Sequence, residues 1–157
     1  MTPAIEVIRA CEYLFLHSIS ESEMETLRIV LHEAQVGAPP SEEQMMGEPS
    51  EIRNLLSGTK SIAHLPGCRV FELVWPDYIG YSVVNESYGS LEPTESIGEG
   101  QLLKTFTKSV YLDYLAQATF ASSDFPGPFK HWAIYCLDHI VNVASTEEPI
   151  IHVTNGI

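Results

Sequence analysis

Histidine and cysteine are the residues of this sequence that could bind a metal ion or act as a nucleophile and its base. They are spread along the chain and show none of the paired spacings of a zinc site. They are His17, His32, His64, His131, His139 and His152, with Cys11, Cys68 and Cys136. Cys136 and His139 could lie side by side across a hairpin, but two ligands fall short of the three or four that zinc requires. We therefore expect neither a metal ion nor a cofactor.

Covalent and acid–base catalysis have no clear signature in the sequence. The Gly-x-Ser-x-Gly motif is absent, and Cys136 with a neighbouring histidine lacks a third group that would orient the base. Asp138 and His139 are adjacent, so on a strand their side chains would point to opposite faces, and Asp138 suits a turn. The sequence therefore favours a protein without enzymatic activity and leaves a small enzyme as the alternative.

Acidic residues set the overall charge of the protein. Eight Lys and Arg residues against 21 Asp and Glu residues give a net charge of −13. This charge repels the phosphates of nucleic acids and anionic lipid surfaces, so we expect neither as a partner. Carboxylates are concentrated in residues 21–51 and 86–99. Such segments could attract a basic protein, or they could serve only to keep the protein soluble.

Six residues of these two segments are our candidates for contacting a basic partner. The glutamates are chosen for their charge. Tyr88 is chosen because an aromatic side chain in a Gly- and Ser-rich loop has no obvious reason to be buried. The candidates are Glu42, Glu43, Glu48, Tyr88, Glu92 and Glu95.

The composition is typical of one folded domain that spans residues 1–157. Hydrophobic residues make up 45% of the chain and charged residues 18%, which allows a core without disulfide bonds. Three dispersed cysteines argue against a secreted disulfide framework. The first residues lack the basic and apolar regions of a signal peptide, and no apolar run is long enough to span a membrane. We therefore expect a cytoplasmic protein.

Apolar spacing and capping patterns predict two main helices. Ser20 followed by Glu23 matches a capping box, and apolar residues then recur at helical spacing up to Gln35. A second helix is expected after a cap at Thr107 or Ser109 and before the Pro- and Gly-rich residues 124–128. Its apolar face would consist of Val110, Tyr111, Tyr114, Leu115 and Ala118. Residues 37–49 are rich in Pro, Gly and Glu, and we expect them to form a surface loop.

Runs of β-branched and aromatic residues predict two hairpins. Residues 68–85 hold two such runs about a Pro-Asp turn, and we expect them to pair with each other. Residues 131–145 hold two more, where a tight turn would pair Trp132 with Val143 and place the large apolar side chains on one face. Shorter strands are expected over residues 9–17, 102–106 and 149–153.

The order of these elements predicts an α+β fold. We expect an antiparallel or mixed β-sheet of about five to six strands with two main helices packed on one face. A doubly wound α/β fold is the alternative, but two of the connections between strands are too short for it.

The face of the C-terminal hairpin opposite its apolar side chains is mixed in character, and it is either covered by another element or used. A pocket between this face and the loop around Tyr88 is one hypothesis for a ligand site, with His131, Tyr135 and His139 as its candidate residues.

Size, charge and the lack of catalytic motifs favour a non-enzymatic protein-binding module. In this interpretation the chain is a small acidic inhibitor or immunity-type protein that masks a basic partner. The alternative is a small enzyme or ligand-binding domain with a pocket near the C-terminal hairpin. A third interpretation is a subunit of a homo-oligomer or larger assembly, which would carry a broad apolar patch on its outer sheet face.

Overall fold

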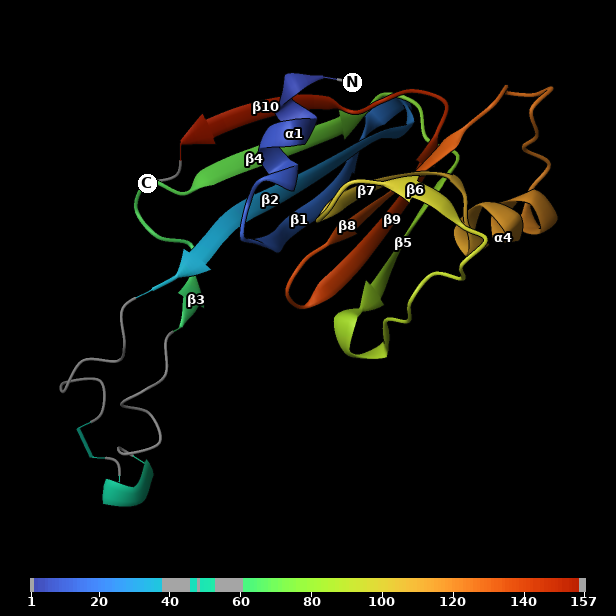
Figure 1. Ribbon diagram of the computed structural model, residues 1–157. Coiled ribbons are helices and arrows are strands. Elements are labelled where there is room, and N and C mark those ends of the chain that lie inside the picture. The colour runs from blue at the N-terminus through green and yellow to red at the C-terminus, as the bar shows by residue number, and fades with distance from the viewer. Residues whose placement is uncertain (1, 38–45, 48, 53–60, 156–157) are drawn as a thin grey trace.

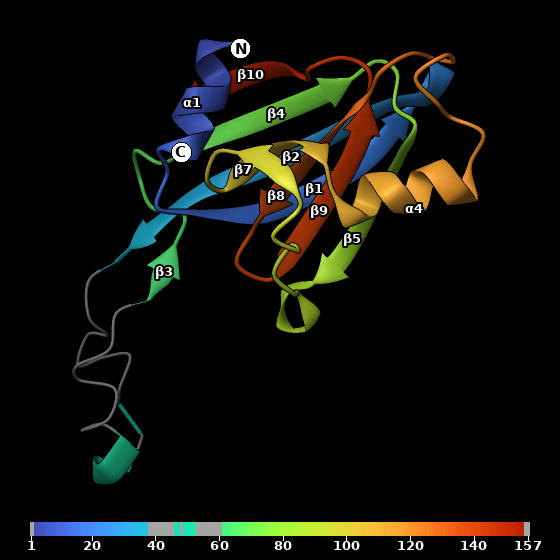
Figure 2. The same ribbon diagram turned by 45° about the vertical axis from the view of Figure 1, so that its right-hand side comes forward.

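The computed structural model describes residues 2–37, 46–47, 49–52 and 61–155, and over these ranges it consists mainly of antiparallel β-strands (Figures 1 and 2). The first sheet contains β1 (Tyr13–Ser22), β2 (Thr26–Val36), β3 (Ile62–Ala63), β4 (Arg69–Trp75) and β10 (Ile150–Asn155). The second contains β5 (Gly80–Asn85), β6 (Ile97–Glu99), β7 (Leu103–Lys108), β8 (Lys130–Tyr135) and β9 (His139–Ser145). The longer helices are α1 (Pro3–Arg9) and α4 (Val110–Ala118), and short 3₁₀ turns form η1 (Glu23–Glu25) and η2 (Glu86–Tyr88).

The strand orders show which strands lie at the sheet edges. The first sheet runs β1-β2-β4-β10, with β3 paired to the end of β2. The second runs β5-β9-β8-β7-β6. Strands β5 and β10 are therefore edge strands. Strands β4 and β5 follow each other in the sequence but belong to different sheets.

The core lies between the two sheets. Side chains alternate along each strand, so one face of each sheet can be wholly apolar. The buried residues of these inner faces are Leu27, Ile29, Leu31, Phe71, Leu73 and Trp75 in the first sheet, and Leu103, Trp132, Ile134, Val141 and Val143 in the second. Trp75 and Trp132 meet edge to face with ring centroids 6.2 Å apart, and this contact joins the two sheets.

Helix α1 bridges the two sheets, since it contacts β10 in the first and β7 in the second. Ile5 and Ile8 are fully buried and extend the core beneath the helix. Arg9 donates from Nε to the carbonyl oxygen of Leu103 at 2.9 Å and from Nη2 to Oγ1 of Thr105 at 3.2 Å. These hydrogen bonds hold the C-terminal end of α1 against the second sheet.

The predicted α+β fold is wrong. Over the residues that the structure describes, the chain forms two five-stranded sheets, and no pair of helices packs on one sheet. The largest error is the predicted helix from Ser20 to Gln35, which is the end of β1, a turn and β2. Leu27, Ile29 and Leu31 alternate along β2 and all point into the core. The apolar residues of this segment fit a helical and a strand period, and pairing with β1 and β4 stabilises the strand.

The predicted hairpin at residues 68–85 is also wrong. Trp75 pairs with Leu27 of β2, whereas Gly80 pairs with Ala144 of β9. The connection between β4 and β5 therefore crosses from one sheet to the other. Both strands have the alternation of a half-buried strand, and that pattern does not specify which neighbour a strand pairs with.

The predicted C-terminal hairpin is confirmed in its register. Trp132 pairs with Val143 and Ile134 pairs with Val141, and all four side chains are buried on the inner face. The predicted second helix is confirmed as α4, with Ser109 as its cap. The strand at 102–106 and the edge strand near 149–153 are confirmed as β7 and β10. Most of the predicted loop at 37–49 lies outside the described residues.

No helix in the described part of the chain is long and apolar enough to cross a membrane.

Candidate functional site

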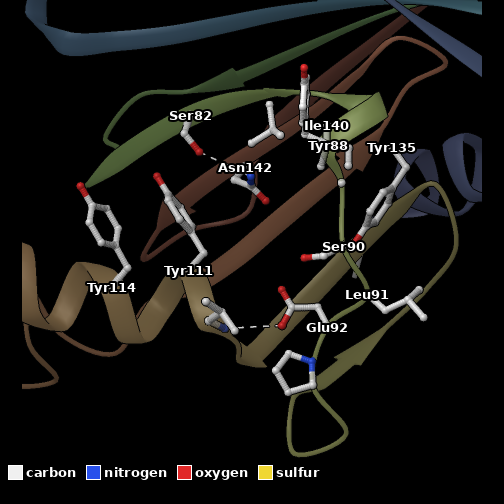
Figure 3. A pocket seen from close by; sticks show the side chains of 14 residues that line it. Ser82, Tyr88, Ser90, Leu91, Glu92, Tyr111, Tyr114, Tyr135, Ile140 and Asn142 are labelled. Atoms are coloured by element: carbon white, nitrogen blue, oxygen red, sulfur yellow. Dashed lines mark hydrogen bonds between the residues drawn. The ribbon is translucent and has the colours of Figure 1, made fainter.

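A cavity of about 480 Å³ lies on the outer face of the second sheet (Figure 3). Strands β5, β8 and β9 form its floor, and α4 and the loop from η2 to Pro93 form its sides. The lining residues are Ser82, Val84, Tyr88, Gly89, Ser90, Leu91, Glu92, Pro93, Val110, Tyr111, Tyr114, Tyr135, Ile140 and Asn142. The volume falls within the range of roughly 300–1,000 Å³ that is usual for small-molecule sites.

Four tyrosines give the cavity its aromatic character. Tyr111 and Tyr114 are three residues apart on α4, which places them on one helix face, and their rings stack with centroids 6.2 Å apart. Tyr135 ends β8, and Tyr88 ends η2. Burial raises the pKa of Tyr111 and of Tyr135 above the usual value of 10.0. Both phenols are therefore neutral at physiological pH and present uncharged aromatic surfaces.

A chain of hydrogen bonds runs from the N-terminus of α4 to the cavity floor and fixes two of the polar groups there. Ser109 Oγ lies 2.8 Å from His131 Nδ1, and His131 Nε2 lies 2.7 Å from Asn142 Oδ1. Asn142 Nδ2 donates to Ser82 Oγ at 3.4 Å. Because Asn142 Oδ1 can only accept, His131 carries its proton on Nε2, and Nδ1 accepts from the Ser109 hydroxyl. Ser82 and Asn142 both line the cavity, so the chain reaches its floor, and Ser82 slightly offsets the effect of burial on the pKa of Tyr111.

The Ser109, His131 and Asn142 side chains have the residue types of a nucleophile, base and orienting group, but their environment is unsuited to that chemistry. Ser109 and His131 are each only 1% exposed. Ser109 Oγ also accepts from the Leu112 amide at 3.2 Å and so caps α4. Burial lowers the pKa of His131 below 6.5, despite smaller opposing effects of Asn142 and Glu92. The imidazole is therefore a neutral, buried structural group.

Glu92 is the charged residue among those that line the cavity. Its Oε2 atom accepts from Ser96 Oγ at 2.7 Å and from the Val110 amide at 3.5 Å, next to the N-terminus of α4. The negative charge of Glu92 also acts on Tyr135, where it adds to the larger effect of burial in raising the pKa of the phenol. The contact with α4 holds the loop at one side of the cavity.

The structure brings together three of the residues predicted from the sequence. Tyr88, Glu92 and Tyr135 all line the cavity. Tyr88 was chosen for a partner surface and lies at the rim, 82% exposed. His131 does not line the cavity; it lies on the outer face against Tyr111 of α4, where it holds Asn142. His139 is half-buried at the start of β9 and does not line the cavity.

The remaining acidic candidates are not gathered at this site. Glu95 is exposed and does not line the cavity. Glu42, Glu43 and Glu48 lie outside the described residues.

Sequence reasoning missed the contribution of α4 and of two polar strand residues. The apolar spacing predicts that Tyr111 and Tyr114 belong to an apolar helix face, although two phenols at that spacing are a signal for a face that retains polar contacts. Asn142 and Ser82 interrupt otherwise apolar strands at positions of the outer face. A polar residue at such a position indicates a hydrogen-bonded network or a binding surface.

The other titratable groups of the described chain offer weaker chemistry. Within the described ranges no three or more His, Cys, Asp or Glu residues are arranged to hold a metal ion. His17 and His32 stack face to face at 4.2 Å, and this geometry does not direct their nitrogens to one point. The three cysteines are buried and free. Burial raises the pKa of Cys11 to about 11 and that of Cys136 to about 12, so both remain unreactive thiols.

The cavity is thus suited to binding a flat molecule between aromatic walls, with polar contacts from Ser82, Asn142 and Glu92. Its polar groups are held in place by bonds that exist before any ligand enters. Comparison of the whole chain with protein-family models, with curated proteins and with solved structures found no match.

Proposed function

We propose that this protein is a non-enzymatic binding protein whose recognition site is the tyrosine-lined cavity on the outer face of the second sheet. The observation that carries this proposal is the combination of a cavity of about 480 Å³ with four tyrosines in its wall. The ligand that suits such a wall is a small, flat, amphipathic molecule, because aromatic rings offer large contact areas and phenol groups offer hydrogen bonds.

Binding is favoured over catalysis by the state of the reactive groups near the cavity. The Ser109 hydroxyl is buried and caps a helix, and the His131 imidazole is buried and neutral. A general base must reach the proton that it removes, and neither group lines the cavity. The groups that do line it are suited to contacting a ligand rather than to cleaving one.

The test uses tryptophol, a neutral indole alcohol, as the probe. We expect its addition to shift the backbone amide signals of β5, β9 and α4 in two-dimensional NMR spectra of the labelled protein. Val84→Trp should abolish these shifts, because Val84 lines the cavity and an indole there would fill it. Val83→Trp is the matched control, since Val83 is 42% exposed, adjacent on the same edge strand and not part of the lining.

Two results would overturn this proposal. One is the absence of shifts at the lining residues with tryptophol and with every other aromatic probe. The other is an equal response of the two tryptophan variants, which would show that the probe binds elsewhere.

Docking of a basic protein is a second candidate function. It is supported by the net charge of −13 and by an exposed apolar rim around the cavity. In this rim Leu91 is 97% exposed, Tyr88 82%, Tyr114 59% and Val110 54%. A basic partner could cover these apolar side chains and be attracted by the carboxylates beside them. We expect such binding to weaken as salt rises, because salt screens the attraction between the charges.

The measurement for this candidate is the affinity for a lysine-rich protein such as a histone at increasing ionic strength. Leu91→Ser keeps the charge and should lower the affinity if the rim forms the contact. Replacement of Glu42, Glu43 and Glu48 by Gln should lower the association rate. A response to salt alone, with no effect of Leu91→Ser, would contradict docking at the rim.

A further inference from the structure

The cavity wall is asymmetric in charge. Of the residues of the described chain that line it, Glu92 is charged and none is Lys, Arg or His. The nearby His131 imidazole is neutral, and both of its nitrogens are occupied by hydrogen bonds to Ser109 and Asn142. An anionic ligand would therefore meet a carboxylate and no compensating cation inside the cavity.

The Glu92 carboxylate is held in position and retains one oxygen for a ligand. Oε2 is occupied by the Ser96 hydroxyl and the Val110 amide. Oε1 makes no hydrogen bond to any residue within the described ranges. In Figure 3 this second oxygen points toward the space between Tyr111 and Tyr135. A ligand donor in that space could reach a carboxylate that does not need to reorient.

The tyrosine rings add a second feature that favours positive charge. The face of an aromatic ring carries negative electrostatic potential, so a cation above it is attracted, most strongly where water is partly excluded. Tyr111 and Tyr135 are half-buried and uncharged, and both border the space near Glu92. The net charge of −13 further favours the approach of cations over anions.

From these contacts we propose that the cavity binds a small organic cation, in which an ammonium group near Glu92 is attached to a flat apolar body that lies between Tyr111 and Tyr135. The inference rests on the proposed binding function of the cavity and names the class of its ligand. A free small molecule suits the cavity better than a lysine side chain, because a single side chain would leave much of a volume of about 480 Å³ unfilled.

The experiment compares three probes that share the indole ring and differ in charge. Tryptamine carries an ammonium group, tryptophol is neutral, and indole-3-acetate carries a carboxylate. Dissociation constants are measured from NMR shifts of the lining residues at physiological ionic strength. We expect tryptamine to bind about tenfold more tightly than tryptophol, as for a partly desolvated contact of a cation with aromatic rings and a carboxylate, and indole-3-acetate to bind most weakly.

Glu92→Gln tests the carboxylate itself. Glutamine retains an oxygen that can accept from Ser96 and Val110, so the loop should keep its position. We expect the tenfold preference for tryptamine over tryptophol to fall to about twofold or less, with tryptophol binding unchanged. Glu25→Gln is the matched control, because it removes the same charge from the exposed turn between β1 and β2 and should keep the preference.

The outcomes separate this inference from the proposed function. Binding of tryptophol without a preference for tryptamine would overturn the cation proposal and leave the binding function standing. Equal loss of preference in Glu92→Gln and Glu25→Gln would also overturn it, because only the overall charge would then matter. A hexalysine peptide that binds at the lining residues more tightly than tryptamine would replace the small molecule by a basic polypeptide. No shift at these residues with any probe would overturn the binding function itself.

Discussion

The two faces of the hairpin formed by β8 and β9 use the same backbone for opposite purposes. On the inner face Trp132, Ile134, Val141 and Val143 are at most 1% exposed and pack against the first sheet. The side chains that alternate with these point to the outer face. There His131 and Asn142 hydrogen-bond each other, and Asn142 and Ser82 form part of the cavity floor. The inner face is specified by packing and the outer face by directional bonds. A substitution should therefore lower stability most on the inner face, whereas a substitution on the outer face should also alter binding.

Trp132→Ala, on the inner face, should have the largest effect on stability. It removes a buried indole at the contact between the sheets and leaves a cavity there, so we expect the free energy of unfolding to fall by about 3–5 kcal/mol. Urea denaturation measures this change. An unfolding midpoint equal to that of the native protein would show that Trp132 is not part of the core.

Asn142→Leu should have the next largest effect, on the outer face of the same hairpin. It leaves His131 Nε2 without its acceptor in a buried position, which we expect to lower the free energy of unfolding by about 1–3 kcal/mol. It also removes the hydrogen bond to Ser82 and a polar group of the cavity floor, so tryptophol affinity should fall. Ser82→Ala is the milder comparison, because it leaves the bond between His131 and Asn142 intact. An equal loss of stability in the two variants would contradict the chain of bonds described here.

Lowering the pH should destabilise the protein through histidines that the fold keeps neutral. Burial lowers the pKa of His131, and burial and the nearby His17 and His64 lower that of His32. Below pH 6.5 the unfolded chain binds protons that the folded chain does not, so the free energy of unfolding falls as pH falls. The slope is at most about 1.4 kcal/mol per pH unit for each histidine. Urea denaturation between pH 7 and pH 5 should show a smaller slope in His131→Gln, and an unchanged slope would contradict this explanation.

Leu91→Ser should have the smallest effect on stability. Leu91 is 97% exposed at the rim, so we expect the free energy of unfolding to change by less than about 0.5 kcal/mol. If the rim contributes to ligand contact, tryptophol affinity should still decrease. Thermal unfolding together with NMR titration measures both quantities, and a marked loss of stability would show that the loop depends on Leu91 for its fold.

The elements that could be predicted from the sequence are those whose determinants are local. The register of the C-terminal hairpin follows from strict alternation about a tight turn, and α4 follows from its spacing and from the cap at Ser109. The predicted helix over residues 20–35 failed because its apolar residues satisfy two periods at once. The predicted hairpin at 68–85 failed because alternation does not name the partner strand.

The candidate site divides in the same way. Tyr88 and Tyr135 were chosen from composition and alternation, and both line the cavity. The part played by Tyr111 and Tyr114 could not be derived, because it depends on where α4 lies against β5 and β9. The acidic residues were chosen for charge alone, and the charge of Glu92 matters at the cavity only because its loop lies beside α4.

The sequence by itself determined the net charge, the wide spacing of the cysteines, and the alternation and apolar face of the C-terminal hairpin. These properties depend on residue types and on spacing within one element. Only the tertiary structure decided that β4 and β5 belong to different sheets and that α4 covers the outer face of the second one. The pairing of distant strands depends on burial and hydrogen bonding over the whole folded chain, so it cannot be predicted from any single segment.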